Sequence, residues 1–507
     1  MFAKTSRRDL FKLGVSAAAF STLATAEENS LLAGQVRCRQ TGKGLPNIRV
    51  SNGRDIVRTD QHGYYTIHLE PQDVAFVIKP RGYAPLLDER NLPRLHAPSG
   101  VKHFDFWLQP EDEPERFDVL LIADPQPGNQ QELSFLTDIL ALISQKNASR
   151  FVMTLGDLIG DQPQLYETYD HLMAQLNLPI YNLPGNHDLD FSKSSPKDAR
   201  ALWRELYGPG TRAFEYGPAL FITLDNIGHG SSKGGHYGYI GDVGADNLRF
   251  VESVLRDVPK EQLIILAMHI PLVSSAPKAD LSCHTHDHQV LLSLLEGRPC
   301  LSLSGHMHTY EHHEIETREG ALHHHHVLNA LCGSWWTGPL DPNGQPVAQS
   351  CDGTPNGWYV LSVDGAKAQV MFHAARNPSA LRVMVGAGDG KNCALMAQRI
   401  SCEDLPQARL FANVFAGGAQ TRVAVKIAGQ GPQWMARSKQ IDPSTQALFA
   451  AAGNSRKPWV EPVASTHLWV SDLPKELSPG FHRIDVEVFE RGVFVARSTY
   501  FLNVVDG

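Results

Sequence analysis

The stretch PIYNLPGNHD, residues 179–188, begins as a short apolar run and ends in an amide, an imidazole and a carboxylate. Similar apolar runs occur between residues 117 and 330, namely DVLLIA, RFVMTL, ALFITL, LIILAM and CLSLS. Runs of this kind are typical of strands buried on both faces of an α/β protein. Between them, apolar residues recur at helical spacing, as at Leu133, Leu136 and Leu140. We therefore expect an α/β domain over residues 117–350, with helices covering its sheets.

Residues of the metal-ligand type follow the ends of five of these strands. Strand ends gather at one edge of an α/β sheet, so residues far apart in the sequence can lie close together there. A mixture of carboxylate, amide and imidazole donors suits a pair of divalent transition ions. A glycine precedes three of them and would let the backbone turn sharply off the strand. The residues are Asp124, Gln126, Asp157, Asn186, His187, His269, His306 and His308.

The segments on either side have a different pattern of apolar and polar residues. Residues 31–110 contain short alternating segments such as YYTIHL, separated by turn residues, which predict a small β-sandwich. This segment resembles the transthyretin-like or carboxypeptidase regulatory type of module. Residues 352–507 return to alternation, from WYVLSV and AQVMFHA to VARSTYFL, and predict a second β-sandwich.

The first 26 residues have the pattern of an export signal. Arg7 and Arg8 precede a short apolar run that ends in Ala24-Thr25-Ala26, and they resemble a twin-arginine signal. No other stretch approaches the ~20 apolar residues of a membrane-spanning helix. We therefore expect a periplasmic or otherwise extracytoplasmic protein. Cleavage would remove four basic residues and one acidic residue, changing the formal charge from −8 to −11.

The polar residues form the ordered set Asp-x-Gln, Gly-Asp, Gly-Asn-His-Asp, His and Gly-His-x-His across residues 124–308. This set resembles the calcineurin-like metallophosphoesterase superfamily, and the flanking modules resemble the terminal domains of one bacterial branch of these enzymes. The resemblance implies a two-sheet α/β sandwich between two β-sandwiches. It also implies a phosphoesterase that hydrolyses phosphate mono- or diesters through a hydroxide bridging two metal ions.

The resemblance assigns a role to each residue. It makes Asp124, Gln126, Asp157 and His308 the ligands of a first metal, and Asp157, Asn186, His269 and His306 those of a second. It places His187 against the substrate, where it would stabilise the transition state or protonate the leaving oxygen. Asp188 would then hold the His187 ring in the useful tautomer.

Gln126 departs from the commoner histidine at its position. An amide oxygen is a harder donor than imidazole and would favour manganese, magnesium or iron(II) over zinc. We therefore expect two divalent ions, with manganese, iron and zinc all open.

Two other function classes fit parts of the sequence. A phosphodiesterase or nuclease acting on a polymer would need clustered lysine and arginine, and the acidic mature charge argues for a small phosphorylated substrate instead. A non-catalytic binding protein would need only the β-sandwiches, but every expected ligand position holds a competent donor. Roles remain open for the histidine tract 323–326, for Trp335 and Trp336, and for Lys233 and His236 in a glycine-rich loop. The oligomeric state is also open.

Overall fold

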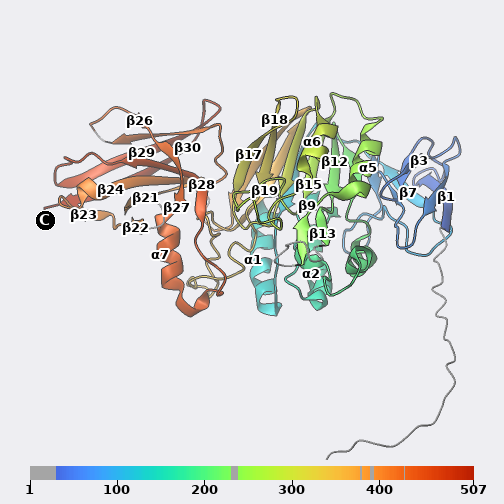
Figure 1. The fold of residues 1–507 in the computed structure, drawn as a ribbon, viewed down its shortest axis with the longest axis horizontal. Helices are drawn as coiled ribbons and strands as arrows, with labels where there is room; N and C mark the ends of the chain where they lie inside the picture. Colours follow the sequence, from blue (N-terminus) through green and yellow to red (C-terminus); the bar gives the residue numbers. More distant parts are fainter. Residues whose placement is uncertain (1–29, 230–237, 377–378, 389–392, 428, 507) are drawn as a thin grey trace, which may run out of the picture.

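The computed structural model describes residues 30–229, 238–376, 379–388, 393–427 and 429–506. Figure 1 shows three parts in a row, with an α/β part between an N-terminal and a C-terminal β part. The predicted export signal, residues 1–26, lies outside the described residues, as do Lys233 and His236. No helix within the described ranges is long and apolar enough to cross a membrane.

The N-terminal part is a β-sandwich of short strands. In β4(Tyr64–Leu69) buried and exposed residues alternate, as expected for a strand with one face on a core and one in solvent. One sheet has the order β4, β1(Ser30–Cys38), β7(Phe106–Pro110), β6(Tyr83–Pro85). The other has the order β3(Ile56–Arg58), β2(Arg49–Ser51), β5(Phe76–Val77).

The central part has two mixed sheets that pack face to face. The first has the order β10(Ile180–Tyr181), β9(Val152–Thr154), β8(Arg116–Ile122), β19(Gly357–Asp364), β20(Lys367–Ala374). The second has the order β11(Arg212–Tyr216), β12(Ala219–Leu224), β15(Leu263–Met268), β16(Cys300–Ser304), β18(Leu322–Val327), β17(Glu311–Glu316). A small hairpin, β13(Ile227–His229) and β14(Tyr239–Gly241), adjoins them.

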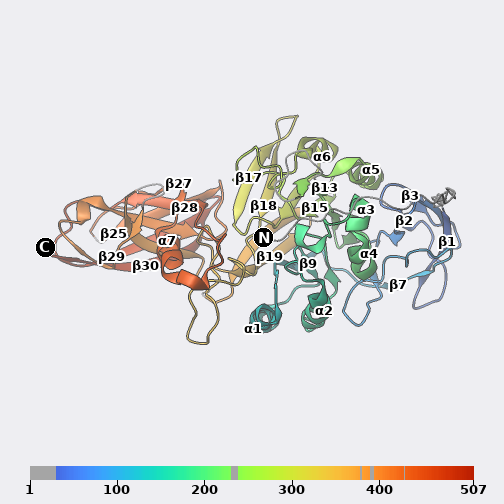
Figure 2. The ribbon, with the colours of Figure 1, turned by 60° about the horizontal axis from the view of Figure 1, so that its bottom comes forward.

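Helices cover the outer faces of both sheets. Leu121 and Ile265 belong to the core between the sheets. Their strand neighbours Leu120 and Ile264 point the other way, against α1 and α2 and against α5 and α6 respectively. The two-sheet α/β sandwich predicted from the sequence is thus confirmed (Figures 1 and 2). The helices are α1(Gln130–Lys146), α2(Tyr166–Ala174), α3(Pro196–Ala199), α4(Ala201–Tyr207), α5(Gly244–Leu255) and α6(His288–Leu295).

Two strands predicted for the C-terminal sandwich belong to the central part. The segments WYVLSV and AQVMFHA form β19 and β20, and β19 pairs antiparallel with β8 from Tyr359 opposite Leu121 to Asp364 opposite Arg116. The start of the C-terminal sandwich at residue 352 is therefore wrong. The physical reason is that β8 has a free edge on the side away from β9, which β19 and β20 cover.

The C-terminal part begins with β21 and is a sandwich of two five-stranded sheets around a core that includes Leu410, Val425 and Val486. One sheet has the order β22(Ala394–Leu395), β21(Leu381–Ala387), β24(Ala408–Val414), β28(Ala464–Asp472), β27(Ala436–Ile441). The other has the order β23(Arg399–Ser401), β30(Val493–Val505), β29(Gly480–Glu490), β25(Thr421–Ile427), β26(Gln433–Trp434). One helix, α7(Pro443–Ala452), faces the central part.

Polar contacts, one of them fully buried, join the parts. Lys79 of the N-terminal sandwich lies 2.6 Å from Glu113, both side chains being 1% exposed, and donates to the carbonyl oxygen of Glu215 in β11. Lys457 of the C-terminal part lies 2.9 Å from Glu132 in α1. A buried cation with its carboxylate partner holds a fixed geometry because separating the pair would leave an uncompensated charge.

Candidate metal centre

The ends of five strands bring the predicted ligands into one buried site. Asp124, Asp157, His269 and His308 are each at most 2% exposed. Polar groups buried to this degree need partners. The strand before each group is β8 for Asp124 and Gln126, β9 for Asp157, β10 for Asn186, β15 for His269, and β16 for His306 and His308.

Asp157, His269 and His306 form a close group, with one ligand atom of each within 4.8 Å of the others. His269 Nε2 lies 3.0 Å from Asn186 Oδ1, 3.1 Å from His306 Nδ1 and 3.3 Å from Asp157 Oδ2. These four residues are the ones that the sequence predicts for the second metal.

Asp124, Gln126 and His308 lie beside this group. His308 Nε2 is 3.8 Å from Asp124 Oδ1. The backbone N–H of Gln126 donates to the carbonyl oxygen of Asp157 at 3.1 Å. Gln126 Oε1 is buried and has no hydrogen-bond partner among the described residues. A buried oxygen without a donor fits a ligand to a cation, because the cation would replace the missing hydrogen bond.

Backbone carbonyl groups orient the three histidine rings. His269 Nδ1–H donates to Leu155 at 2.7 Å, His306 Nε2–H to Ser282 at 3.0 Å, and His308 Nδ1–H to Gly333 at 2.7 Å. In each ring the second nitrogen is left to face the site. Such contacts fix the tautomer and orientation of metal-binding histidines.

The buried carboxylates of the site favour the binding of a positive charge. Burial, reinforced by the Asp157 charge, raises the pKa of Asp124 to about 8. Burial lowers the pKa of His269, but Asp157 and Asp124 outweigh it and raise that pKa to about 9. The two carboxylates therefore draw a positive charge into the site. Metal ions meet this requirement and displace the proton from the ligand nitrogen.

Five of the predicted ligands have backbone φ angles in the left-handed region. Such a conformation costs non-glycine residues about 1–3 kcal/mol each and persists where surrounding contacts enforce it, as at functional sites. Gly185 allows Asp157 to come close to the turn that follows, because a Cβ at position 185 would lie 2.1 Å from Asp157 Oδ1. The φ angles are 45° at Asp124, 41° at Gln126, 52° at Asp157, 76° at His306 and 53° at His308.

His187 lies at the more open side of the site, with its side chain 31% exposed. Its backbone N–H donates to Asp157 Oδ1 at 2.9 Å. Its Nδ1 lies 2.8 Å from Asp161 Oδ2, and the Asp161 side chain is 68% exposed. Asp161 was not among the residues predicted from the sequence, although the second Gly-Asp of GDLIGD was a signal that could have identified it.

The prediction that Asp188 orients His187 is wrong. The Asp188 carboxylate accepts hydrogen bonds from the N–H groups of Gly185 and Leu158 and from the hydroxyl of Tyr166, at 2.8–3.2 Å. In the 3₁₀ turn η2(Asn186–Asp188) successive side chains point in different directions, so sequence neighbours need not touch. Asp188 thus ties the turn that carries Asn186 and His187 to the loop after β9.

Trp335 and Trp336 lie beside the centre, whereas the histidine tract lies in β18. The Trp335 ring stacks on His308, with 3.8 Å between centroids. Trp336 is 4% exposed and its Nε1–H donates to the Pro125 carbonyl oxygen at 2.8 Å. In the tract 323–326, which lies in β18, buried and half-buried residues alternate. In the part of the chain that is described, this tract does not supply three groups close enough to hold a metal ion.

Three family models match the chain in order: the N terminal of calcineurin-like phosphoesterase at residues 31–111, calcineurin-like phosphoesterase at residues 117–310, and the C terminal of calcineurin-like phosphoesterase at residues 325–493. A 3′,5′-cyclic-nucleotide phosphodiesterase from Nostoc sp. is 28% identical over 198 residues, which span 38% of this chain and 69% of that protein.

Two solved structures are also similar. A dimetal phosphatase from Danio rerio is 13% identical, with 50% of this chain and 98% of that chain covered and a TM-score of 0.34. A purple acid phosphatase from yellow lupin (Lupinus luteus) seeds is 12% identical, with 66% and 68% covered and a TM-score of 0.38. The family models span all three parts of the fold, and their central one contains all nine residues predicted for the site. The chain belongs to the calcineurin-like phosphoesterase family and is a metal-dependent phosphoric ester hydrolase.

Proposed function

We propose that this enzyme hydrolyses phosphate mono- or diesters of small extracytoplasmic substrates, using two divalent ions of manganese, iron or zinc. The observation that supports this most strongly is the meeting of seven ligand-type residues in one buried site, where the Gln126 oxygen has no hydrogen-bond partner within the described ranges. Asp124, Gln126, Asp157 and His308 would hold one ion; Asp157, Asn186, His269 and His306 would hold the other. When bound, the ions would supply an activated water and neutralise the phosphoryl oxygens.

His187 is the proton donor in this proposal. The Asp161 carboxylate lies 2.8 Å from Nδ1 as an ion-pair partner, although Nδ1 has no well-aligned hydrogen bond among the described residues. Its negative charge would favour a proton on Nδ1 and leave Nε2 available to the leaving oxygen. His187 then donates a proton from Nε2 as the ester bond breaks, or stabilises the charge that develops on the leaving oxygen. Asp161 stabilises the ring while it is positively charged and fixes its orientation. His187 is a catalytic residue in this scheme and Asp161 is a positioning residue.

Asp188 positions the reacting groups without touching the substrate. Its three hydrogen bonds to Gly185, Leu158 and Tyr166 fix the turn in which Asn186 faces the centre and His187 faces the more open side. A neutral amide such as Asn186 coordinates a cation without adding a negative charge that would repel phosphate. This explains why an amide and an imidazole are adjacent at this strand end.

Small substrates suit the chain's charge. Clustered positive charge is the usual requirement for holding a nucleic-acid polymer, and the chain carries a formal charge of −8. The relative from Nostoc sp. makes 3′,5′-cyclic nucleotides the first diesters to test. The twin-arginine-like segment supports a periplasmic location, and replacing Arg7 and Arg8 by lysine should keep the protein in the cytoplasm. Unchanged export of that variant would argue against this route.

Metal analysis followed by a substrate panel tests the proposed function. The purified enzyme should contain two divalent ions per chain and hydrolyse at least one of a cyclic nucleotide, bis-nitrophenyl phosphate and nitrophenyl phosphate. Chelation should abolish turnover and divalent metal should restore it. Turnover that survives complete removal of metal would contradict the proposed site. Hydrolysis of DNA in preference to all three small esters would favour the polymer-directed alternative.

A further inference from the structure

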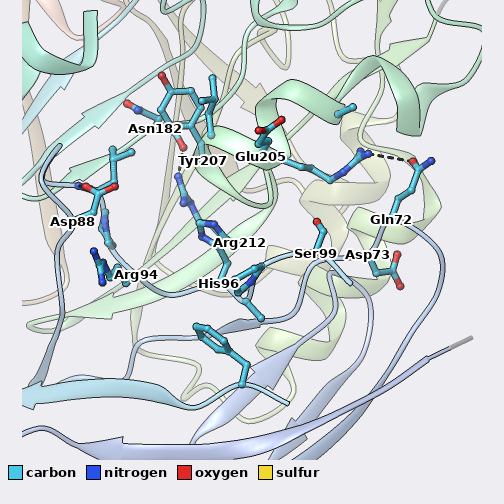
Figure 3. A pocket seen from close by; sticks show the side chains of 18 of the residues that line it. Gln72, Asp73, Asp88, Arg94, His96, Ser99, Asn182, Glu205, Tyr207 and Arg212 are labelled. Atoms are coloured by element: carbon cyan, nitrogen blue, oxygen red, sulfur yellow. Dashed lines mark hydrogen bonds between the residues drawn. The ribbon is translucent and has the colours of Figure 1, made fainter. Parts of the chain in front are cut away.

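A large cavity lies between the N-terminal sandwich and the central part, separate from the metal centre (Figure 3). Its volume is about 930 Å³. One wall comes from two loops of the N-terminal sandwich, within residues 69–73 and 88–104. The other wall comes from the end of β10, from α4 and from the first residue of β11. This volume falls in the range of about 300–1,000 Å³ that is typical of sites for small organic molecules.

Arg212 is the buried charge in the wall of this cavity. The residue is only 7% exposed. One nitrogen, Nη2, donates to the carbonyl oxygen of Asn182, while Nε has no partner among the described residues. No carboxylate of those residues forms an ion pair with the guanidinium, and burial lowers the pKa of Arg212 to about 10. A buried arginine almost always has an anionic partner, because an uncompensated charge in such a place is costly.

His96 lies beside Arg212 in this wall. Figure 3 shows Arg212 between Asn182 and His96. Burial, and after it the charges of Arg212 and Arg90, lower the pKa of His96 to about 4. The His96 ring packs closely against Gly208, since a Cβ there would lie 2.5 Å from His96 Nδ1. The neutral ring can therefore offer a hydrogen bond beside the unpaired guanidinium.

The acidic residues around the cavity do not neutralise Arg212. Asp88 accepts hydrogen bonds from Arg90 at 2.9 and 3.0 Å, and Asp73 accepts two from Arg54 at 2.6 and 3.1 Å. The remaining acidic lining residues, Glu70, Glu89 and Glu205, are exposed. The two acids deeper in the wall thus have arginine partners of their own, whereas no carboxylate in the described part of the chain pairs with Arg212.

We propose that this cavity binds a small organic anion whose carboxylate or phosphate group pairs with Arg212, beside His96. The planar guanidinium matches both oxyanions through paired N–H donors. The cavity is far larger than an inorganic ion, and apolar groups of Leu92, Phe104 and Ile180 also line it. The ligand therefore carries an uncharged remainder. This site does not depend on the proposed reaction at the metal centre.

Calorimetric titration of the metal-loaded enzyme tests the proposal, with inorganic phosphate and succinate as the two probes. Arg212→Met should weaken binding of the responding probe roughly ten- to hundredfold, the usual effect of losing a charge-assisted hydrogen bond. Arg116→Met is the matched control, because Arg116 is exposed and pairs with Asp364 on a different part of the surface. The control should bind as the unaltered enzyme does. Phosphate bound at the metal centre should remain in all three proteins.

Thermal unfolding supplies a second readout. Without a probe, Arg212→Met should melt at the same or a higher temperature than the unaltered enzyme, because the variant removes a buried unpaired charge. The probe should raise the midpoint of the unaltered enzyme and of Arg116→Met but not that of Arg212→Met. If Arg212→Met fails to fold, His96→Asn replaces it, with an expected severalfold loss of affinity.

The outcomes separate the possible ligands. A response to succinate alone identifies a carboxylate site, and a response to phosphate alone, lost in Arg212→Met, identifies a phosphate site. Equal binding of both probes by the unaltered enzyme and Arg212→Met would overturn the proposal, and so would an equal loss in Arg116→Met. Failure of the metal centre to hydrolyse any ester would leave these titrations unaffected, so the two proposals fail separately.

Discussion

The contact between Asp161 and His187 allows a quantitative test of the proposed proton donor. Asp161→Asn removes the carboxylate that lies 2.8 Å from His187 Nδ1 while keeping its size. Because the Asp161 side chain is 68% exposed, water screens the pair, and an exposed ion pair is worth about 0.2–1 kcal/mol. Loss of the preferred tautomer adds to this. We expect kcat to fall about tenfold, which corresponds to about 1.4 kcal/mol in the barrier.

His187→Ala should have a much larger effect. Loss of one positioned acid costs roughly 10²-fold to 10⁴-fold in rate. The loss should be smaller for a nitrophenyl ester than for an alkyl ester, since nitrophenolate leaves without much help from a proton. Both variants should keep two metal ions, because neither residue is among the proposed ligands. Steady-state rates with the two esters, together with metal analysis of the same preparations, provide the measurement.

The double variant decides whether Asp161 acts through His187. If it does, Asp161→Asn should cause almost no further loss in the His187→Ala background, because the ring that it positions is gone. An undiminished tenfold loss in that background would refute the positioning role. A fall in the metal content of His187→Ala would instead make His187 a ligand. Near-normal turnover of His187→Ala would leave it a purely structural residue.

Three further predictions concern the metal ligands and the histidine tract. Asp157→Asn should lower metal content and turnover together, and two ions per chain in that folded variant would contradict its assignment to both sites. Gln126→His should raise zinc affinity relative to manganese, whereas unchanged metal selectivity would show that Gln126 is not a ligand. Burial lowers the pKa of His323 to about 4 from an ordinary value of 6.5, so the unfolded chain binds this proton more readily. The stability that His323 contributes is therefore present above pH 6.5 and falls by about 1.4 kcal/mol per unit as the pH drops towards 4. In urea unfolding between pH 4.5 and 7, the free energy of unfolding of His323→Asn should fall less steeply with decreasing pH, by about 1.4 kcal/mol per pH unit. The same pH dependence in the variant and the unaltered enzyme would refute this reasoning.

The position of the candidate ligands was predictable because two simple patterns coincide. Apolar runs such as LIILAM mark strands buried on both faces, and ligand-type residues such as His269 stand at their ends. Parallel strands bring such ends together whatever their separation in the sequence. The structure follows this logic, since His269 approaches Asn186 and His306 within about 3 Å although 83 and 37 residues separate them.

The sheet membership of β19 and β20 was not predictable from the same patterns. An antiparallel strand at the edge of an α/β sheet alternates between more and less exposed residues as a sandwich strand does, and β20 alternates exposed and half-buried residues over most of its length. Periodicity identifies a strand and its faces, but the partner strand depends on which edge is open. The open edge of β8 is a property of the assembled sheet, and no local sequence signal reports it.

Asp161 and Asp188 show a similar limit within the site. Asp188 stands next to His187 in the sequence, yet its carboxylate is enclosed by Gly185, Leu158 and Tyr166. Asp161, 26 residues away, reaches the ring instead. Residues that bind metal are restricted in type, so the sequence can suggest them. A residue that orients a ring needs only an acceptor in the right place, and many residue types in many loops can meet that need.

At the metal centre and at the Arg212 cavity the fold buries charges that need a partner of opposite charge, negative charges at the first and a positive charge at the second. At the metal centre the fold buries Asp124 and Asp157 so that the pKa values of the surrounding groups are shifted to draw in a positive charge. At the cavity it buries Arg212 with no carboxylate partner among the residues that the structure describes, beside a His96 ring that stays neutral. A buried charge is tolerated when an opposite charge compensates it. The Lys79–Glu113 pair, at the junction of the N-terminal sandwich and the central part, is a case in which the chain supplies both partners. Where the chain supplies only one partner, the other is expected from outside: cations at the strand ends and an anion at the domain junction.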